Sequence, residues 1–266
     1  MRLFREDLEL SVIPPLNQMS SGSDELLNGE QLVSDIQRFR GNIYVEDGAI
    51  PHSALDLQGR HRSEFDLYCY HICLRTVTGE LAGALRVRLY GNDITPSGLN
   101  LYALVVRSAP EIRPTLVKAI AETLQEARNQ GLKVGEVGGW AVDRTLSGSA
   151  NGILLPLAGW GLVRQLGNAI IIAAATSKHS SAEILVRLGG YYLRLDGRVV
   201  PEFYDPDYRC GMRLLVLNSR SIAAKYQRFI PKIQFVPLAE DPKHAAETSR
   251  LEQMRYNQAT GALALL

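Results

Sequence analysis

The sequence predicts a mixed α/β fold, in which a sheet of parallel and antiparallel strands carries helices on both faces. Residues 65–75 are rich in aromatic and β-branched side chains, and residues 81–89 alternate between two faces. With Thr78-Gly79 between them, these segments are expected to form an antiparallel hairpin, which disfavours a fully parallel sheet. Further along, helix and strand patterns alternate from residue 110 to residue 217.

The remaining elements follow from local patterns. Asp24 can cap a helix over residues 24–40 that Gly41 ends, and residues 110–131 form a long amphipathic helix. Residues 169–175 are all apolar, as expected of a strand covered on both faces. The other expected elements are strands at 134–142, 191–195 and 211–217 and helices at 151–166, 181–188 and 221–229. Residues 1–23 look irregular, and residues 239–266 are polar and peripheral.

This pattern divides the chain into three parts. An N-terminal arm and the start of the first helix occupy residues 1–34, the main domain residues 35–218, and a helical extension residues 219–266. The net charge of +1 gives no reason to expect binding to nucleic acid. The longest apolar run is too short to span a bilayer, the N-terminus lacks a signal-peptide pattern, and three cysteines without a framework suit the cytoplasm.

The most informative stretch is 136–192, which reads as strand, Ser/Gly-rich turn, apolar helix, buried strand and short helix. Arg144, Ser147, Gly148 and Ser149 precede the helix at 151–166, where free backbone N–H groups and the helix dipole favour a phosphate. Such a turn is also common at ordinary helix starts. The pattern favours a site for the phosphopantetheine arm of an acyl thioester.

Two glycines interrupt the preceding strand. Gly138 and Gly139 mark either a bulge or a close approach of another backbone. A bulge would free a backbone N–H, of Trp140 or Ala141, to bind the thioester oxygen during acyl transfer. The alternative is that the glycines only make room for a neighbouring helix.

Over residues 35–218 the chain resembles the GNAT-fold N-acyltransferases, and within them the N-acyl amino acid synthases and acyl-homoserine lactone synthases. The resemblance lies in residues 64–68 (EFDLY), in residues 79–86 (GELAGALR), in Glu136 on the fourth strand, in the Leu-Gly turn after residues 181–188, and in residues 205–217 (DPDYRCGMRLLVL). It implies a GNAT-like mixed sheet and amide formation from an acyl thioester by direct attack.

The chain departs from the family pattern at several positions. Ser147 and Ser149 replace glycines of the phosphate loop, and Leu185 replaces a frequent tyrosine that serves as general acid. Gly139 and Cys69 stand where homoserine lactone synthases carry Arg and Asp. These differences weigh against S-adenosylmethionine as the acceptor.

Several polar residues are candidates for the chemistry. Glu136 can accept the amine proton or be a solvated strand residue, and His71 can be a base or a packed core histidine. Glu64 and Asp66 begin a strand and could hold the ammonium group of the acceptor; Arg86 could orient them.

The remaining candidates concern the donor. His179 can contact the thioester arm or cap a helix, and Cys69 and Cys73 are expected to be structural thiols. No histidine spacing indicates a metal. The apolar helix 153–166, with residues 101–106 and 110–131, could line a tunnel for a fatty acyl chain or simply be core.

The donor is acyl-CoA or the phosphopantetheine of an acyl carrier protein, with no permanently bound cofactor. The resemblance implies the carrier protein, and Arg144, Arg164, Lys178 and Arg187 could form a basic patch for it or a solvated face. The acceptor is the amine of an amino acid or of a Lys or ornithine side chain in a peptide precursor. The alternatives are an acyl-homoserine lactone synthase and a GNAT-like binding protein without activity.

Overall fold

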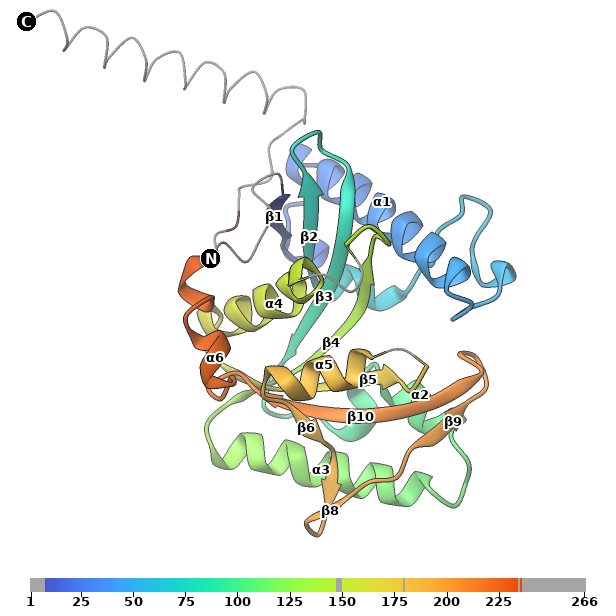
Figure 1. Cartoon of the computed structure of the whole chain (residues 1–266), viewed down its shortest axis with the longest axis vertical. Helices are drawn as coiled ribbons and strands as arrows, with labels where there is room; N and C mark the ends of the chain where they lie inside the picture. The colour runs from blue at the N-terminus through green and yellow to red at the C-terminus, as the bar shows by residue number, and fades with distance from the viewer. Residues whose placement is uncertain (1–7, 147–149, 179, 234, 236–266) are drawn as a thin grey trace, which may run out of the picture.

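The computed structural model describes residues 8–146, 150–178, 180–233 and 235. Its main feature is an eight-stranded mixed sheet in the order β1-β2-β3-β4-β5-β10-β6, with β9 also paired to β10 (Figure 1). The strands of this sheet are β1 (Leu8–Ile13), β2 (Tyr70–Thr76), β3 (Leu81–Tyr90), β4 (Lys133–Val142), β5 (Ala169–Thr176), β6 (Tyr191–Tyr192), β9 (Phe203–Asp205) and β10 (Cys210–Asn218). A small second sheet pairs β7 (Arg194–Leu195) with β8 (Arg198–Val199).

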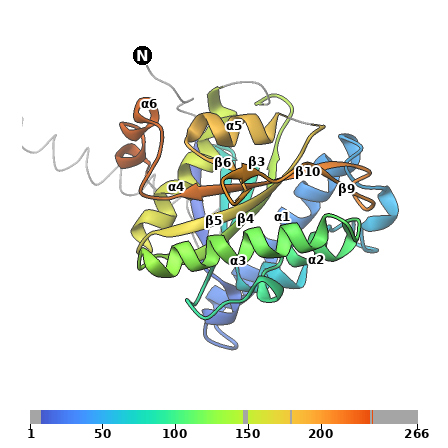
Figure 2. The same cartoon turned by 90° about the horizontal axis from the view of Figure 1, so that it is seen from below.

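Helices cover both faces of the sheet, as the sequence predicts. The α-helices are α1 (Asp24–Glu46), α2 (Tyr102–Arg107), α3 (Arg113–Asn129), α4 (Leu154–Gln165), α5 (Ser181–Leu188) and α6 (Ala224–Gln227). Figure 2 shows α1, α2 and α3 on one face and α4 and α5 on the other. The hairpin of β2 and β3 is antiparallel, and β4 and β5 are the parallel pair.

The N-terminal part differs from the prediction in two ways. Residues 8–13, expected to be irregular, pair with β2 as an edge strand. Helix α1 does not end at Gly41 but continues to Glu46, and Ser23 rather than Asp24 caps it. Gly41 is needed for packing, because a Cβ atom there would lie 2.8 Å from the side chain of Leu55. Gly41 therefore allows the side chain of Leu55 to pack closely against α1.

Another difference concerns the segment before β2. Residues Glu64–Tyr68 were expected to begin the strand, but they form a 3-10 helix, η3, that a capping box of Ser63 and Asp66 closes. The strand begins only at Tyr70. The C-terminal helix is also shorter than expected, with four residues in α6. The polar segment 239–266 lies outside the described residues.

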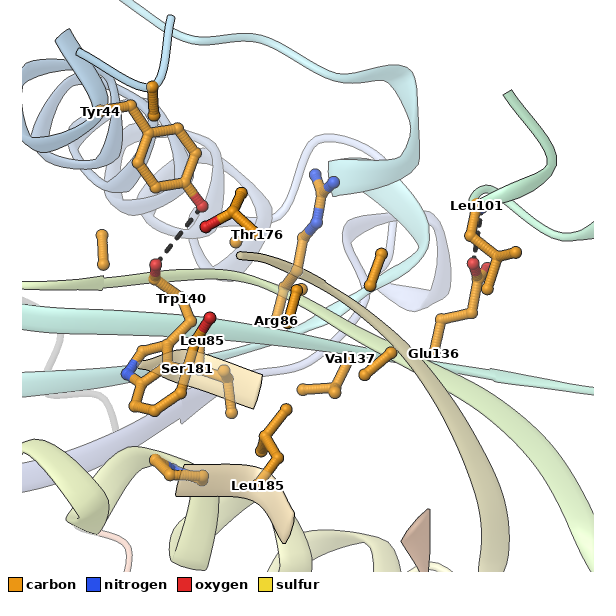
Figure 3. Close-up of a pocket in the computed structure, with 18 of the residues that line it drawn as sticks. Tyr44, Leu85, Arg86, Leu101, Glu136, Val137, Trp140, Thr176, Ser181 and Leu185 are labelled. Atoms are coloured by element: carbon orange, nitrogen blue, oxygen red, sulfur yellow. Dashed lines mark hydrogen bonds between the residues drawn. The ribbon is translucent and has the colours of Figure 1, made fainter. Parts of the chain in front are cut away.

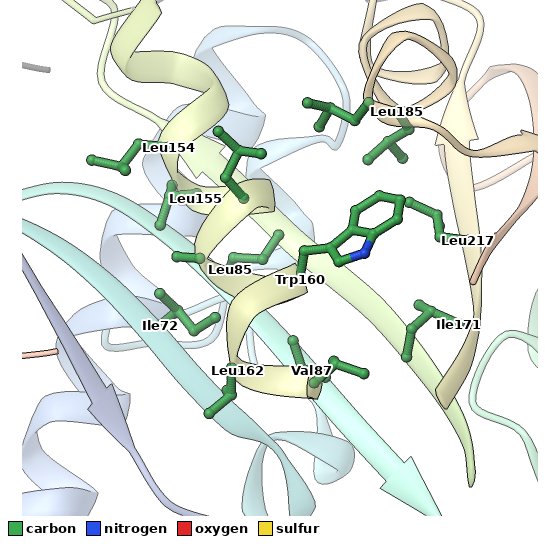
Figure 4. Packing of buried hydrophobic residues seen from close by; sticks show 14 of the residues in the cluster. Ile72, Leu85, Val87, Leu154, Leu155, Trp160, Leu162, Ile171, Leu185 and Leu217 are labelled. Carbon is green, nitrogen blue, oxygen red and sulfur yellow. The ribbon is translucent and has the colours of Figure 1, made fainter. Parts of the chain in front are cut away.

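Helix α4 is held by burial, since no side chain caps its first turn. Every residue from Leu154 to Val163 is buried, and the helix packs on β2 and β3. Figure 4 shows Trp160 extending from α4 toward Leu185 and Leu217, within the cluster that contains all three. Burying a side chain such as Leu or Val stabilises the fold by about 1.5–3 kcal/mol.

Candidate active site

The parallel ladder between β4 and β5 stops halfway along the two strands. Its register runs from Lys133 opposite Ala169 to Val137 opposite Ala173. Beyond these residues β4 pairs with β3 alone, and β5 pairs with β10 alone. The two central strands therefore separate toward their C-terminal ends.

A β-bulge lies where the strands separate, as the paired glycines predict. Ala84 pairs with Ala141 and Arg86 pairs with Gly138, so two residues of β4 lie opposite one residue of β3. Gly139, within the bulge, has a φ of +63°, a conformation that glycine adopts without a steric cost. The carbonyl oxygen of Trp140 accepts a 3.4 Å hydrogen bond from the hydroxyl of Tyr44 on α1. The bulge turns this carbonyl away from the ladder.

A cavity of about 1320 Å³ occupies the opening, and its walls come from both faces of the sheet (Figure 3). On the α4 and α5 face its lining is mainly apolar, although Ser181 and Arg187 also contribute. We call the apolar part of this lining, which includes Pro156, Trp160, Val163, Leu185 and Leu217, the apolar lobe. On the α1 and α2 face its lining includes Tyr44, Arg86, Arg88, Glu136 and Tyr208, which we call the polar lobe. Helix α3, expected to line a tunnel, contributes no lining residue and packs in a separate core cluster.

Glu136 lines the cavity, but other residues of the protein already donate hydrogen bonds to both of its carboxylate oxygens. They accept hydrogen bonds from the backbone N–H groups of Asn100 (2.8 Å) and Leu101 (2.7 Å) and from the hydroxyl of Tyr90. Figure 3 shows the carboxylate directed at Leu101. A carboxylate at the start of α2 also satisfies N–H groups that a helix leaves unpaired. Glu136 therefore links β4 to the start of α2, whatever further role it has.

Asp66 lies in a buried ion cluster and not in the wall of the cavity. Its carboxylate accepts hydrogen bonds from Arg40 (2.9 Å), Arg86 (2.5 Å) and Gln37 (2.9 Å), and only 1% of its side chain is exposed. Although burial alone raises the pKa of a carboxyl group, the guanidinium groups of Arg40 and Arg86 hold the pKa of Asp66 well below its usual range. The expectation that Asp66 holds an ammonium group is corrected, because this carboxylate is already enclosed by two cations of its own chain.

Arg86 does orient Asp66, as one reading of the sequence predicts, and it also faces the cavity. A Cβ atom on Gly139 would lie 3.1 Å from Nη1 of Arg40 and 3.2 Å from Cγ of Arg86. The ion cluster therefore lies directly beneath the bulge. With two guanidinium groups and one carboxylate, it has a net charge of one positive unit.

Two further candidates lie outside the cavity wall. Glu64 is exposed on η3, and His71 is completely buried on β2. Nε2 of His71 lies 2.8 Å from the backbone carbonyl oxygen of Asp66, and burial lowers the pKa of His71 to about 4. The proposal of His71 as a base is corrected, since its neutral ring is packed in the core. The same burial raises the pKa of Cys69 to about 11 and of Cys73 to about 12, which agrees with structural thiols.

Two residues of the polar lobe were missed in the sequence. Tyr44 follows Arg40 by four positions on one face of α1, but the helix was expected to end before it. The guanidinium carbon of Arg88 lies 4.6–4.9 Å from the ring centroids of Tyr90, Phe65 and Tyr68. Its Nη1 is buried and has no hydrogen-bond partner among the described residues. The alternation of β3 could have placed Arg88 on the same face as Arg86.

The mouth of the opening is bounded by two cations. Arg144 donates to the carbonyl oxygen of Glu46 (3.2 Å), and Nζ of Lys178 donates to that of Asp47 (2.9 Å), both at the C-terminal end of α1. A helix C-terminus favours cations. Arg164 instead donates to the carbonyl oxygen of Ser219, beside the start of β5, so the four predicted cations do not form one patch.

Other candidates at the mouth cannot be placed in this way, since Ser147, Gly148, Ser149 and His179 lie outside the described residues. Within the described part of the chain no group of His, Cys, Asp or Glu side chains could hold a metal ion. None of the helices there has the length and hydropathy that a membrane span requires.

Comparisons with known proteins give matches in structure only. A scan against protein-family models gives no match, and a search of curated proteins gives none either. The CoA-dependent acyl-homoserine lactone synthase MesI is 12% identical and covers 86% of this chain and 99% of its own, with a TM-score of 0.53. BjaI, a second such synthase, with SAM and isopentyl-CoA, is 13% identical and covers 85% of this chain and 88% of its own, with a TM-score of 0.52.

A third match is FeeM, an N-acyl amino acid synthase from uncultured soil microbes. It is 17% identical and covers 80% of this chain and 91% of its own, with a TM-score of 0.47. The sheet order, the separated parallel strands and the likeness to the lactone synthases lead to one conclusion: this chain has the GNAT-like α/β fold.

Proposed function

We propose that this chain is an N-acyltransferase that moves a fatty acyl group from an acyl thioester to an amine. The observation that carries the proposal is the cavity at the separated strands, with an apolar lobe on one face of the sheet and a polar lobe on the other. Donor and acceptor can thus approach the bulge from opposite faces. Transfer then occurs by direct attack of the amine on the thioester.

The apolar lobe supports a long acyl chain as the donor group. Its side chains come from α4, α5 and β10 and are buried, so an acyl chain within it would leave water. Each buried CH₂ of the chain would contribute about 0.8 kcal/mol to binding. An acetyl group would leave most of this lobe empty.

The mouth of the opening supports a phosphate-bearing carrier. Arg144 and Lys178 lie there, on the segments that follow β4 and β5. Two cations suit the phosphate of CoA or of a phosphopantetheine arm. Acyl carrier protein is our preferred donor, with acyl-CoA as the alternative, and His179 and residues 147–149 remain candidates for contacts to the arm.

The polar lobe supports an amino acid as the acceptor. Arg88 has a buried nitrogen without a hydrogen-bond partner in the described residues, and a carboxylate would satisfy it. An amine carried by a Lys or ornithine side chain of a peptide would bring no carboxylate to this position. The acceptor amine would then lie between Arg88 and the bulge.

At the reacting centre, a backbone N–H of Trp140 or Ala141 polarises the thioester carbonyl, and Glu136 accepts the amine proton through a water molecule. Trp140, Ala141 and Glu136 all belong to the cavity wall. Because three donors already occupy the carboxylate of Glu136, a bridging water is more suitable than direct contact.

The test is turnover by the full chain. Purified protein is mixed with thioesters from acetyl to palmitoyl, on CoA and on acyl carrier protein, and with amino acids or amines that lack a carboxylate. Thiol release is followed with a thiol-reactive dye and the product by mass spectrometry. We expect amine-dependent release that is fastest with long chains and amino acids; transfer of acetyl alone, or no release with any donor, would contradict the proposal.

A variant tests the proposed base separately. Glu136→Gln should lower kcat about 100-fold or more, since a positioned general base contributes roughly that much. The thermal midpoint of the variant, measured beside the wild type, separates a loss of chemistry from a loss of the link to α2. Full activity in the variant would remove Glu136 from the mechanism.

A further inference from the structure

The hydroxyl of Tyr44 lies beside the bulge at which the proposed reaction would take place. It donates to the carbonyl oxygen of Trp140 at the bulge, 3.4 Å away. The ring is held edge-on against His61, with centroids 5.5 Å apart, and lines the cavity. Figure 3 shows the phenol extending from α1 toward Trp140. The hydroxyl is therefore a proton donor at the wall of the cavity, directed toward the bulge.

A thiolate that leaves a thioester must take up a proton. The position at which related enzymes carry a tyrosine for this step is Leu185 here, a buried residue of the apolar lobe. In the described part of the chain, the cavity wall contains three tyrosines, Tyr44, Tyr208 and Tyr226. Of these, Tyr44 is the one whose hydroxyl contacts the bulge.

Tyr44 also has the right protonation state at neutral pH. Burial raises the pKa of its phenol to about 12, so the hydroxyl retains its proton until it is needed. Arg40 and Arg86 act in the opposite direction and stabilise the phenolate. Because their cluster with Asp66 has a net charge of one positive unit, a phenolate formed at Tyr44 would face a compensating charge.

We propose that Tyr44 is a catalytic residue that donates its proton to the sulfur atom of the leaving carrier. The inference rests on the proposed acyl transfer. The amine nitrogen forms a bond to the thioester carbon, the C–S bond breaks, and the sulfur takes the phenolic proton of Tyr44. The amine proton, accepted first by Glu136, then returns the phenolate to phenol through water, so the products are an amide and a free thiol. The proposed general acid therefore lies on α1, whereas the position of the tyrosine discussed above, Leu185, lies on α5.

The experiment compares two leaving groups in Tyr44→Phe. An alkyl thioester, such as acyl-CoA or an acyl carrier protein donor, leaves as a basic thiolate and needs the proton. A nitrophenyl thioester leaves as a weakly basic thiolate and does not. With the alkyl donor, kcat should fall about 100-fold, as for the loss of a general acid, while the KM for the donor changes little. With the aryl donor most of this loss should disappear.

The outcomes separate the possible roles of Tyr44. Equal losses with both donors would overturn the proposal, because a structural or carbonyl-binding role does not depend on the leaving group. Unchanged kcat would overturn it as well. Absence of turnover in the wild-type protein with every donor would instead refute the acyl transfer itself. Tyr204→Phe is the matched control, since Tyr204 is 60% exposed and lies outside the cavity wall.

A second measurement does not depend on removing the hydroxyl. Difluorotyrosine placed at position 44 lowers the pKa of the phenol and keeps its shape. Because the proton must be present for catalysis, kcat should fall as pH rises through the pKa of Tyr44, and fluorination should move this fall to lower pH. The same substitution at Tyr204 should leave the profile unchanged. An unmoved profile at position 44 would refute the assignment.

Discussion

Gly139→Ala is the most direct test of the bulge. Gly139 has a φ of +63°, and an L-residue in the left-handed region costs about 1–2 kcal/mol. The new Cβ atom would also lie 3.1 Å from Nη1 of Arg40 and 3.2 Å from Cγ of Arg86, closer than ordinary contact. Those side chains must shift by a few tenths of an ångström. We expect a total destabilisation somewhat above the cost of the backbone conformation alone.

Gly131→Ala is the matched control. Gly131 follows α3, has a φ of +61°, and a Cβ atom there would contact nothing within 4 Å. Both variants should be destabilised by the cost of placing an alanine at positive φ. Urea unfolding measures this loss of stability, and the m-value should stay unchanged. The additional loss in Gly139→Ala then reports the contact with the two arginines. For a domain of this size, each kcal/mol corresponds to a fall of roughly 2–4 °C in Tm.

Turnover should separate the two variants more strongly. A displaced bulge moves the group that is proposed to hold the thioester, and a misplacement of about 1 Å can cost roughly 100-fold in rate. Gly131→Ala should retain the wild-type rate. Full turnover in a destabilised Gly139→Ala would refute the reasoning, because the bulge would then have no part in binding the thioester. Equal destabilisation in both variants would show that the side chains of Arg40 and Arg86 move away from the new Cβ atom without a loss of stability.

Three further predictions concern the cluster and the cavity. Asp66→Asn should destabilise the protein by about 3–5 kcal/mol in urea unfolding, since two buried guanidinium groups would lose their anion. Burial lowers the pKa of His71 to about 4, below the value of about 6.5 in the unfolded chain. Between these two pH values the unfolded state binds a proton that the folded state does not. The free energy of unfolding should therefore fall by roughly 3 kcal/mol as pH drops from about 6.5 toward 4. In His71→Gln this part of the pH dependence should disappear. Leu185→Trp should fill the apolar lobe and shift the preferred donor in the chain-length series to shorter acyl groups.

Each of these has a control or a contradicting outcome. Asp35→Asn removes an exposed partner of Arg38 and should have little effect, because surface ion pairs contribute little. His52→Gln removes an exposed histidine and should keep the wild-type pH dependence. If the preference of Leu185→Trp for chain length equals that of the wild type, the acyl chain does not occupy the apolar lobe. A minor loss in Asp66→Asn would mean that the cluster tolerates unpaired cations.

The sequence could predict those parts of the fold that local patterns determine. The turn at Thr78-Gly79 specifies the hairpin, the apolar run specifies β5, and the two glycines of β4 indicate the bulge. In each case, residues that are adjacent in the sequence are enough to predict the structure. The separation of β4 from β5 at this bulge is seen only in the structure.

Long-range contacts could not be read in this way. The sequence predicts a free carboxylate at Asp66 because its partner Arg40 lies 26 residues earlier, on a helix that packs over the same sheet. Gly41 was taken for a helix end, although the packing of Leu55 against it lets α1 continue to Tyr44. The sequence predicts Glu136 as a proton acceptor or a solvated residue, because it does not reveal that the N–H groups of residues 100 and 101 lie beside the carboxylate. A local pattern gives the chemistry of a side chain but not the partner that occupies it.

The contacts at the end of α1 have a mechanical consequence. Five residue pairs join β4 to β5 at one end of the opening, and at the other end Arg144 and Lys178 fasten the segments after both strands to the same helix terminus. Backbone pairing therefore bounds the opening at one end, and two side-chain contacts with the end of α1 bound it at the other. Its width is set by backbone pairs and by a helix end, neither of which depends on a bound molecule. The carrier arm of the proposed donor would therefore enter an opening whose two ends are joined before any donor binds.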